Sequence, residues 1–161
     1  MPTVGLKLGQ EAPLALLDAL SKAGFEVVSE APDIVLITPG EMEREDVERL
    51  VAYVVDGGGL LVCGGTGPLL SALHLTPQGE PVAGAARPGY AGLEPLDVER
   101  ASPVTGVGFV LYRIDDRCVA LGSRRDRGVL AYVGDADPAP PLVLACLRWL
   151  LELRSHSPGK A

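Results

Sequence analysis

The chain has 161 residues, enough to bury one hydrophobic core but too few for two ordinary domains, so we predict a single domain over residues 1–155 and a flexible tail at 156–161. Its apolar content of 47% and charged content of 22% exclude an intrinsically disordered chain. The net charge of −7 repels a phosphate backbone and only 4% of the residues are aromatic, so we expect no nucleic-acid partner.

The three cysteines, at positions 63, 118 and 146, indicate reduced thiols rather than a disulfide framework, because their number is odd. They form no Cys-x-x-Cys motif, and we predict neither a metal nor a cofactor. The N-terminus lacks a basic region followed by an apolar run, and glycines and Pro68 interrupt the uncharged segment 57–75. We therefore expect a cytoplasmic protein that makes no contact with a membrane.

Short apolar segments alternate with helical patterns in the first half of the chain. Residues 3–8 predict a first strand, and residues 11–23 predict a helix that Gly24 ends in the left-handed conformation typical of glycine. Residues 25–28 predict a second strand. Residues 33–37 are nearly continuous in apolar side chains, which is typical of a strand covered on both faces.

A further helix is indicated by apolar residues spaced at i, i+3, i+4 and i+7, which form one buried stripe: Val47, Leu50, Val51 and Val54. Gly57 ends this helix, and residues 59–63 predict a fourth strand that is apolar on both faces. Strands and helices that alternate in this way build a parallel sheet through right-handed crossovers.

The second half of the chain has a different character. Residues 76–92 are rich in proline, glycine and alanine without a period, which predicts a long loop of the kind that often covers a functional site. Four shorter strands follow, separated by turns that favour antiparallel pairing: 96–98, 108–114, 118–122 and 129–133. Pro140 and Pro141 begin a last helix that runs to Leu153.

Four segments carry a resemblance to a known family when they are taken in order: "DALSKAGFEVV", "PDIVLITPGEMEREDVERLVAYVVDGGGLLVCGG", "ASPVTGVGF" and "RGVLAYVGDADPAPPLVLACLRWLL". The chain resembles the class I glutamine amidotransferase-like group of flavodoxin-like domains, which includes the ThuA-like proteins and related uncharacterised domains. The resemblance implies an α/β fold with a three-layer flavodoxin-like sheet, mostly parallel, with antiparallel strands in the second half of the chain.

The same resemblance implies that Cys63 occupies the position of the amidotransferase nucleophile, on a tight turn after a strand. The family places a His-Pro-Glu motif just after the last strand of the domain, to supply the base and its orienting carboxylate. This chain has Gly134, Asp135, Ala136 and Asp137 there, and Ser102 replaces a histidine that often precedes the proline of the third segment. An aspartate anion beside the thiol would raise its pKa, so we predict a pseudoenzyme.

Two residues offer Cys63 an alternative partner. His74 lies eleven residues further along the chain, and Glu11 lies in the loop that carries an acid in proteins similar to DJ-1 and PfpI. With either partner the chain would be a cysteine-dependent hydrolase or a deglycase-like enzyme. Glu11 also has a purely structural interpretation, because a carboxylate at the start of a helix interacts favourably with the helix dipole.

Ligands of open α/β sheets bind outside the carboxyl ends of the strands. The loops expected there supply a set of candidate ligand-binding residues: Gln10, Gly64, Gly65, Thr66, Gly67, Asp135 and Asp137. The glycine-rich loop offers backbone N–H groups to an anion but lacks the lysine of a phosphate-binding loop. We interpret Asp135 and Asp137 as turn or capping residues in preference to Mg²⁺ ligands.

The sequence therefore favours a non-catalytic amidotransferase-like domain that binds a small ligand or a protein partner at the strand carboxyl ends. The cysteine-dependent enzyme is the alternative. A third hypothesis is a structural subunit that forms a homodimer through exposed apolar surface, with which the positive mean hydropathy of +0.25 is compatible.

Overall fold

The computed structural model describes residues 3–6, 18, 20–27, 34–37, 43–63, 67–89, 93–134 and 140–155. Nine of the described strands form one sheet, in the order β2-β1-β3-β4-β11-β10-β9-β6-β7. The first five strands in that order are parallel to one another: β2 (Glu26–Val27), β1 (Thr3–Leu6), β3 (Ile34–Ile37), β4 (Gly59–Cys63) and β11 (Gly128–Val133).

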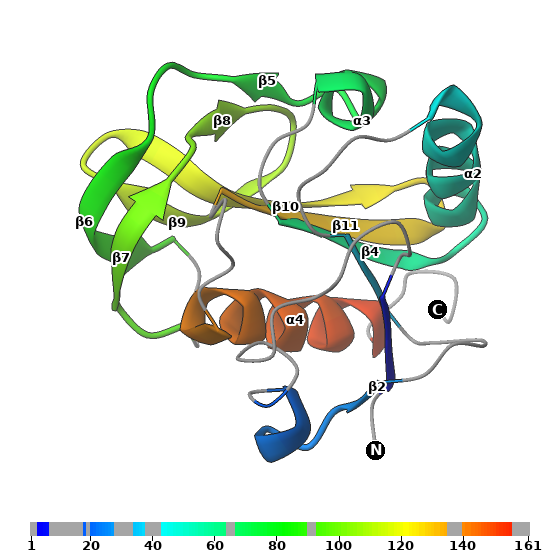
Figure 1. Cartoon of the computed structure of the whole chain (residues 1–161), viewed down its shortest axis with the longest axis horizontal. Helices are drawn as coiled ribbons and strands as arrows, with labels where there is room; N and C mark the ends of the chain where they lie inside the picture. The colour runs from blue at the N-terminus through cyan, green and yellow to red at the C-terminus, as the bar shows by residue number, and fades with distance from the viewer. Residues whose placement is uncertain are drawn as a thin grey trace.

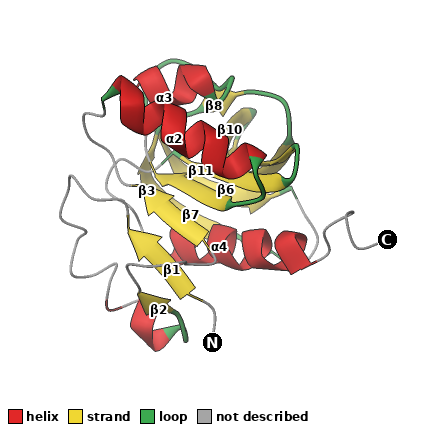
Figure 2. Cartoon of the chain, turned by 90° about the vertical axis from the view of Figure 1, so that its right-hand side faces the viewer, coloured by secondary structure: helices red, strands yellow, loops and turns green. Residues whose placement is uncertain are grey.

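The other four strands of the sheet pair antiparallel: β10 (Arg117–Arg125), β9 (Phe109–Ile114), β6 (Val82–Pro88) and β7 (Leu96–Ala101). A separate antiparallel pair, β5 (Thr76–Pro77) and β8 (Val104–Thr105), lies over the β9–β10 part of the sheet (Figure 1). Helices α2 (Arg44–Val55) and α3 (Gly67–Ala72) cover one face of the sheet, and α4 (Pro140–Ser155) covers the other (Figure 2).

The central strand β4 separates two hydrophobic cores. All five of its residues are buried, and successive side chains of a strand point to opposite faces. Leu60 and Val62 pack with the residues of α2 and α3, whereas Leu61 and Cys63 pack with those of α4. The strand predicted at residues 59–63 is therefore confirmed, together with its burial on both sides.

Two of the predicted helices are confirmed. The apolar stripe found in the sequence belongs to α2, where Val47, Leu50 and Val54 are buried. The last helix runs from Pro140 to Ser155, two residues beyond its predicted end. Most of the helix predicted over residues 11–23 falls outside the described residues.

The antiparallel half of the sheet bends at two successive bulges between β9 and β10. Register shifts on either side of Ala120 leave Val119 of β10 and Leu111 of β9 without a directly opposed partner. Both side chains are fully buried in the core beneath α4. Because bulges bend a strand and increase its twist, they help to curl this half of the sheet into the half-barrel seen on the left of Figure 1.

The predicted fold class was wrong. A three-layer flavodoxin-like sheet would be mostly parallel, but the pairings of this sheet divide equally, with four parallel and four antiparallel among the described strands. The sheet is also strongly curled and mixed in orientation. The physical reason is that the strands after residue 75 outnumber the helices there, so hairpins replace the helical crossovers that a parallel sheet needs.

The predicted long loop over residues 76–92 was also wrong. It contains β5 and β6, and β6 pairs with β7 on one side and β9 on the other. Most side chains of β6 are exposed, so the strand is held by backbone hydrogen bonds and not by an alternating apolar pattern. A sequence rule based on hydrophobic period has no signal to detect in such a strand.

A test of the packing under α4 is the substitution Gly122→Ala. A Cβ at Gly122 would collide with the ring of Trp149, which is buried and also packs edge-on against Phe109 at 6.4 Å between ring centroids. We expect the free energy of unfolding to fall by about 1–3 kcal/mol, the usual cost of overpacking a core. Urea denaturation followed by circular dichroism measures it.

The matched control repeats Gly122→Ala in a Trp149→Leu background, where the smaller side chain leaves space for the new methyl group. The cost should then shrink by about 1 kcal/mol or more, because the two positions are in contact. An equal cost in both backgrounds would show that the ring does not limit the space at Gly122.

Candidate functional site

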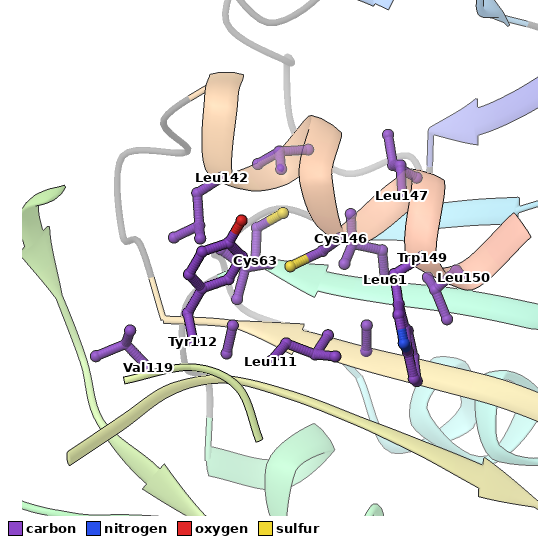
Figure 3. Packing of buried hydrophobic residues seen from close by; sticks show 14 of the residues in the cluster. Leu61, Cys63, Leu111, Tyr112, Val119, Leu142, Cys146, Leu147, Trp149 and Leu150 are labelled. Carbon is purple, nitrogen blue, oxygen red and sulfur yellow. The ribbon is translucent and has the colours of Figure 1, made fainter. Parts of the chain in front are cut away.

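Cys63 lies at the carboxyl end of β4 with its side chain wholly buried. It belongs to the core beneath α4, where the side chains of Cys63 and Cys146 lie side by side among Leu142, Leu147 and Tyr112 (Figure 3). Burial raises the pKa of the Cys146 thiol far above its usual range, and the neighbouring Cys63 adds to the effect. The surroundings of Cys63 are therefore apolar and closed.

His74 lies on the other side of the sheet from Cys63. It follows α3, whose residues Leu69 and Leu70 pack in the core beneath α2 and α3, and its own side chain is exposed. The structure thus does not bring the Cys63 thiol and His74 together. The catalytic roles assigned to them stay predictions, and Glu11 lies outside the described residues.

The backbone of His74 has a structural role at the end of α3. Its N–H donates to the carbonyl of Ser71 at 3.1 Å, and the N–H of Leu75 donates to the carbonyl of Leu70 at 2.8 Å. This pair of hydrogen bonds is the Schellman motif, which needs a left-handed residue, and His74 has φ +59°. Gly57, with φ +117°, takes the same position at the end of α2.

Most of the predicted ligand-binding residues fall outside the described residues: Gln10, Gly64, Gly65, Thr66, Asp135 and Asp137. Gly67 is described as the first residue of α3. Cys63 pairs with Val133, and the carbonyl of the following Gly134 accepts the N–H of Ser102 at 2.6 Å. The carboxyl ends of β4 and β11 therefore lie side by side, and the ligand-binding roles of the loops that follow them stay predictions.

A polar pocket lies elsewhere, between the β5–β8 pair and the β9–β10 hairpin. Its volume is about 350 Å³, and its described lining combines polar and apolar side chains: Gln78, Pro103, Val104, Thr105, Val110, Arg113, Asp116, Arg117 and Cys118. Sequence analysis missed it because residues 76–92 were interpreted as a loop. The available signal was the grouping of Arg113, Asp116 and Arg117 around one tight turn.

Gln78 joins three walls of this pocket. Its backbone N–H donates to the carbonyl of Pro103 at 2.9 Å, and its side-chain Nε2 donates to Oγ1 of Thr105 at 3.2 Å. Its carbonyl oxygen accepts a hydrogen bond of 2.7 Å from Nη1 of Arg117. The chain can turn beside this bond because Gly79 has φ +84°, a backbone conformation that side chains other than glycine rarely adopt.

The β9–β10 hairpin supplies the charged wall. Its two-residue loop begins at Asp115, whose φ of +55° is left-handed, a conformation that aspartate tolerates better than most residues. Asp116 and Arg117 follow directly. Arg113 lies opposite Cys118 on the neighbouring strand, so these two side chains share a face of the sheet.

Cys118 contributes a protonated thiol to the pocket. The side chain is partly buried and its Sγ lies 3.3 Å from the carbonyl oxygen of Ala120, to which it donates. Burial raises the pKa of the thiol, and the hydrogen bond to Ala120 and the charge of Arg113 oppose that effect only in part. At neutral pH Cys118 is therefore a weak nucleophile that can still be reached from the pocket.

Comparisons with known proteins identify the fold. Neither a protein-family model nor a curated protein matches the sequence. Two solved structures of similar length resemble the chain. The cytoplasmic protein STM3548 from Salmonella typhimurium has a TM-score of 0.67 and 15% identity, over 93% of this chain and 99% of that protein. The cytoplasmic protein STM1381 from Salmonella typhimurium LT2 has a TM-score of 0.63 and 14% identity, over 98% of this chain and 100% of that protein.

The same fold occurs within larger enzymes. Gan42B, a GH42 β-galactosidase from G. stearothermophilus, matches with a TM-score of 0.68 and 13% identity over 96% of this chain but only 30% of the enzyme. This chain therefore corresponds to a domain-sized part of the β-galactosidase. At such low identities the likeness establishes the fold alone.

The resemblance to glutamine amidotransferase-like and ThuA-like proteins is corrected by these findings. The neighbours are STM3548-like proteins and domains of GH42 β-galactosidases, and they share a half-barrel fold with a curled mixed sheet. The predicted amidotransferase-like ligand-binding domain was inferred from that resemblance and was wrong. Each of the four segments that carried the resemblance is uninformative by itself, and their order in the chain was insufficient to identify the fold.

Within the described residues, no helix has both the length and the apolar character to cross a membrane. The same residues contain no group of three or more histidine, cysteine, aspartate or glutamate side chains arranged to hold a metal ion. The expected small-molecule or protein partner and the homodimer stay predictions.

Thiol labelling tests the environment of Cys118. In the native protein we expect Ellman's reagent to react with one thiol, because Cys63 and Cys146 are fully buried. The reaction should be slow at pH 7 and accelerate as the pH rises beyond the ordinary thiol pKa of about 8.5, because the raised pKa of Cys118 leaves little thiolate below it.

The control is Cys118→Ser, which should abolish the native reaction and lower the number of thiols that react in denaturant from three to two. Rapid native labelling of the Cys118→Ser protein would contradict the closed surroundings of Cys63 and Cys146.

The capping role of His74 is tested by His74→Gly. Glycine adopts the left-handed conformation without the Cβ clash, so the free energy of unfolding should rise by about 1 kcal/mol. His74→Ala, which keeps a Cβ, should leave it nearly unchanged. Chemical denaturation measures both. If His74→Gly were destabilising, the imidazole would have a role that the backbone geometry does not explain.

Proposed function

We propose that the chain is a binding domain for a small polyhydroxylated molecule of the carbohydrate class, which it holds in the pocket between the β5–β8 pair and the β9–β10 hairpin. The observation that carries the proposal is the set of hydrogen-bonding side chains that Gln78 fixes around that pocket. This site differs in place and chemistry from the strand ends considered in the sequence.

The size and the lining of the pocket suit such a ligand. Its volume of about 350 Å³ lies at the small end of the range of roughly 300–1,000 Å³ found for ligand sites. Sugar hydroxyls both donate and accept hydrogen bonds, and the pocket offers donors on Arg113 and Arg117 and an acceptor on Asp116. Val104 and Val110 supply apolar surface for the C–H groups of a sugar ring.

Binding is favoured over hydrolysis by the count of carboxyl groups. Most glycosidases use two carboxylates that flank the scissile bond, about 5–9.5 Å apart. Among the described residues that line the pocket, Asp116 alone carries a carboxyl group. This set lacks the second carboxylate that would act as nucleophile or base. We therefore propose that the protein binds the sugar without cleaving it.

The neighbouring proteins give weaker support. Two kinds of sugar-processing enzyme share the fold with this chain, β-galactosidases and an exo-β-1,4-mannosidase from an Opitutaceae bacterium. Because the chain covers about a third of those enzymes, what they act on extends to this chain only as a proposal. We include a cytoplasmic location in it, since STM3548 and STM1381 are both called cytoplasmic proteins.

The test is titration calorimetry of the protein with a panel of neutral and acidic monosaccharides, compared with the Thr105→Val variant. That substitution keeps the shape of the side chain but removes the hydroxyl that accepts from Gln78. We expect saturable binding of at least one sugar, weakened by about fivefold to tenfold in the variant, the effect of one lost neutral hydrogen bond.

The matched control is Ser71→Ala, at an exposed position of α3 outside the pocket, which should bind as the parent does. Failure of every sugar in the panel to saturate the protein at millimolar concentration would overturn the proposal. Equal affinities for the parent and Thr105→Val would also overturn it, because the ligand would then lie elsewhere.

A further inference from the structure

The pocket has an excess of positive charge in a chain whose net charge is −7. Its lining holds two arginines, Arg113 and Arg117, against one carboxylate, Asp116. A third arginine, Arg87 of β6, is the direct cross-strand partner of Arg113. Directly opposed residues of antiparallel strands share a face of the sheet, so Arg87 lies beside Arg113 at the edge of the pocket.

Like charges that oppose each other across two strands destabilise a sheet unless another charge compensates them. Within the described residues, no carboxylate forms an ion pair with Arg87, Arg113 or Arg117. The fold therefore places Arg113 beside Arg87 and in the same pocket lining as Arg117, and none of the three forms an ion pair within the described residues. An arrangement of this kind is stabilised when an external anion binds.

Arg117 is the member of the group that is held in position. Its Nη1 donates to the carbonyl oxygen of Gln78, and the other N–H groups of the planar guanidinium remain available for a ligand. Less side-chain entropy is lost when a ligand binds to a group that is already fixed. The planar fork of an arginine matches two oxygens of a carboxylate or a phosphate, which a lysine would not do.

We propose that the ligand is an anionic sugar, whose acidic group binds between Arg113 and Arg117 while its hydroxyls bind Thr105 and Asp116. This inference rests on the proposed function and narrows it from carbohydrates in general to those that carry a carboxylate or a phosphate. Arg117 is the residue that determines the specificity for the acid. Arg87, at the rim, strengthens the attraction without being part of the lining.

The experiment compares three probes of similar size by titration calorimetry: glucose, glucuronate and glucose 6-phosphate. We expect at least one of the two anions to bind roughly tenfold or more tightly than glucose, which is the effect of a hydrogen-bonded charge pair. The preference should decrease as salt is added, because the ions screen a partly exposed charge, whereas binding of glucose should not change. The stronger of the two anions identifies the acidic group as carboxylate or phosphate.

Arg117→Gln is the variant that tests the assignment, and Arg49→Gln, at an exposed position of α2, is the matched control with the same loss of charge. Arg117→Gln should lower the ratio of the affinity for the favoured anion to the affinity for glucose by about tenfold, because glutamine keeps a donor for sugar hydroxyls but carries no charge. Arg49→Gln should change neither affinity. Circular dichroism and the denaturation midpoint of Arg117→Gln establish that the variant is folded.

The outcomes separate this inference from the proposed function. Equal affinity for glucose and both anions, or an anion affinity that Arg117→Gln does not change, would overturn the anionic ligand and leave the carbohydrate pocket in place. If none of the three probes and no other sugar of the panel bound, the proposed function would fail and this inference with it.

Discussion

The structure depends on the two different pairings of β11. Along one side β11 is parallel to β4, and along the other it is antiparallel to β10, so this strand joins the two halves of the sheet. All six of its residues are buried, and its first residue must be glycine, because a Cβ at Gly128 would collide with the carbonyl oxygen of Val54. The close approach of α2 to the start of β11 thus requires a residue without a side chain at this position.

The pocket is a consequence of what happens beyond β11. Once the chain forms hairpins, no helical crossover is available to cover the strands, and bulges at Val119 and Leu111 bend the sheet instead. The bend lies next to the pair formed by Arg113 and Cys118, at the end of the hairpin that faces β8. Gln78 is bound to Pro103 and Thr105 by two hydrogen bonds, and its carbonyl oxygen accepts a third from Arg117, which ties the β5–β8 pair to this end of the hairpin. The pocket forms between the curled sheet and the β5–β8 pair that is hydrogen-bonded to it.

The sequence predicted those elements whose side chains decide their structure. The stripe of Val47, Leu50 and Val54 has the helical period and β4 is a short continuous apolar run, and both elements were predicted from these patterns. The strand β6 was missed because most of its side chains are exposed and it is held by backbone pairing. The antiparallel pairing of the later strands was indicated by the turns between them, and not by their hydrophobic period. The pocket could not be predicted, because it joins residues 78, 105 and 117, which only the curled topology brings together. Conversely, Cys63 attracted notice in the sequence because glycines follow it. Its side chain is buried by residues of α4, which come much later in the chain.

The charge of the pocket illustrates how little the net charge says about a local site. Acidic residues are numerous on α2, for example Glu45 and Glu48, but α2 lies at the opposite side of the molecule from the β9–β10 hairpin (Figure 1). Charges separated by more than the Debye length, about 8 Å at physiological salt, are largely screened from each other. The field in the pocket is therefore set by the charges close to it, which are Arg113, Arg117 and Asp116 of the lining and Arg87 beside Arg113. Asp116 offsets one of the two arginines of the lining and Arg87 adds a further positive charge beside Arg113, so the local charge is positive although the chain as a whole is acidic.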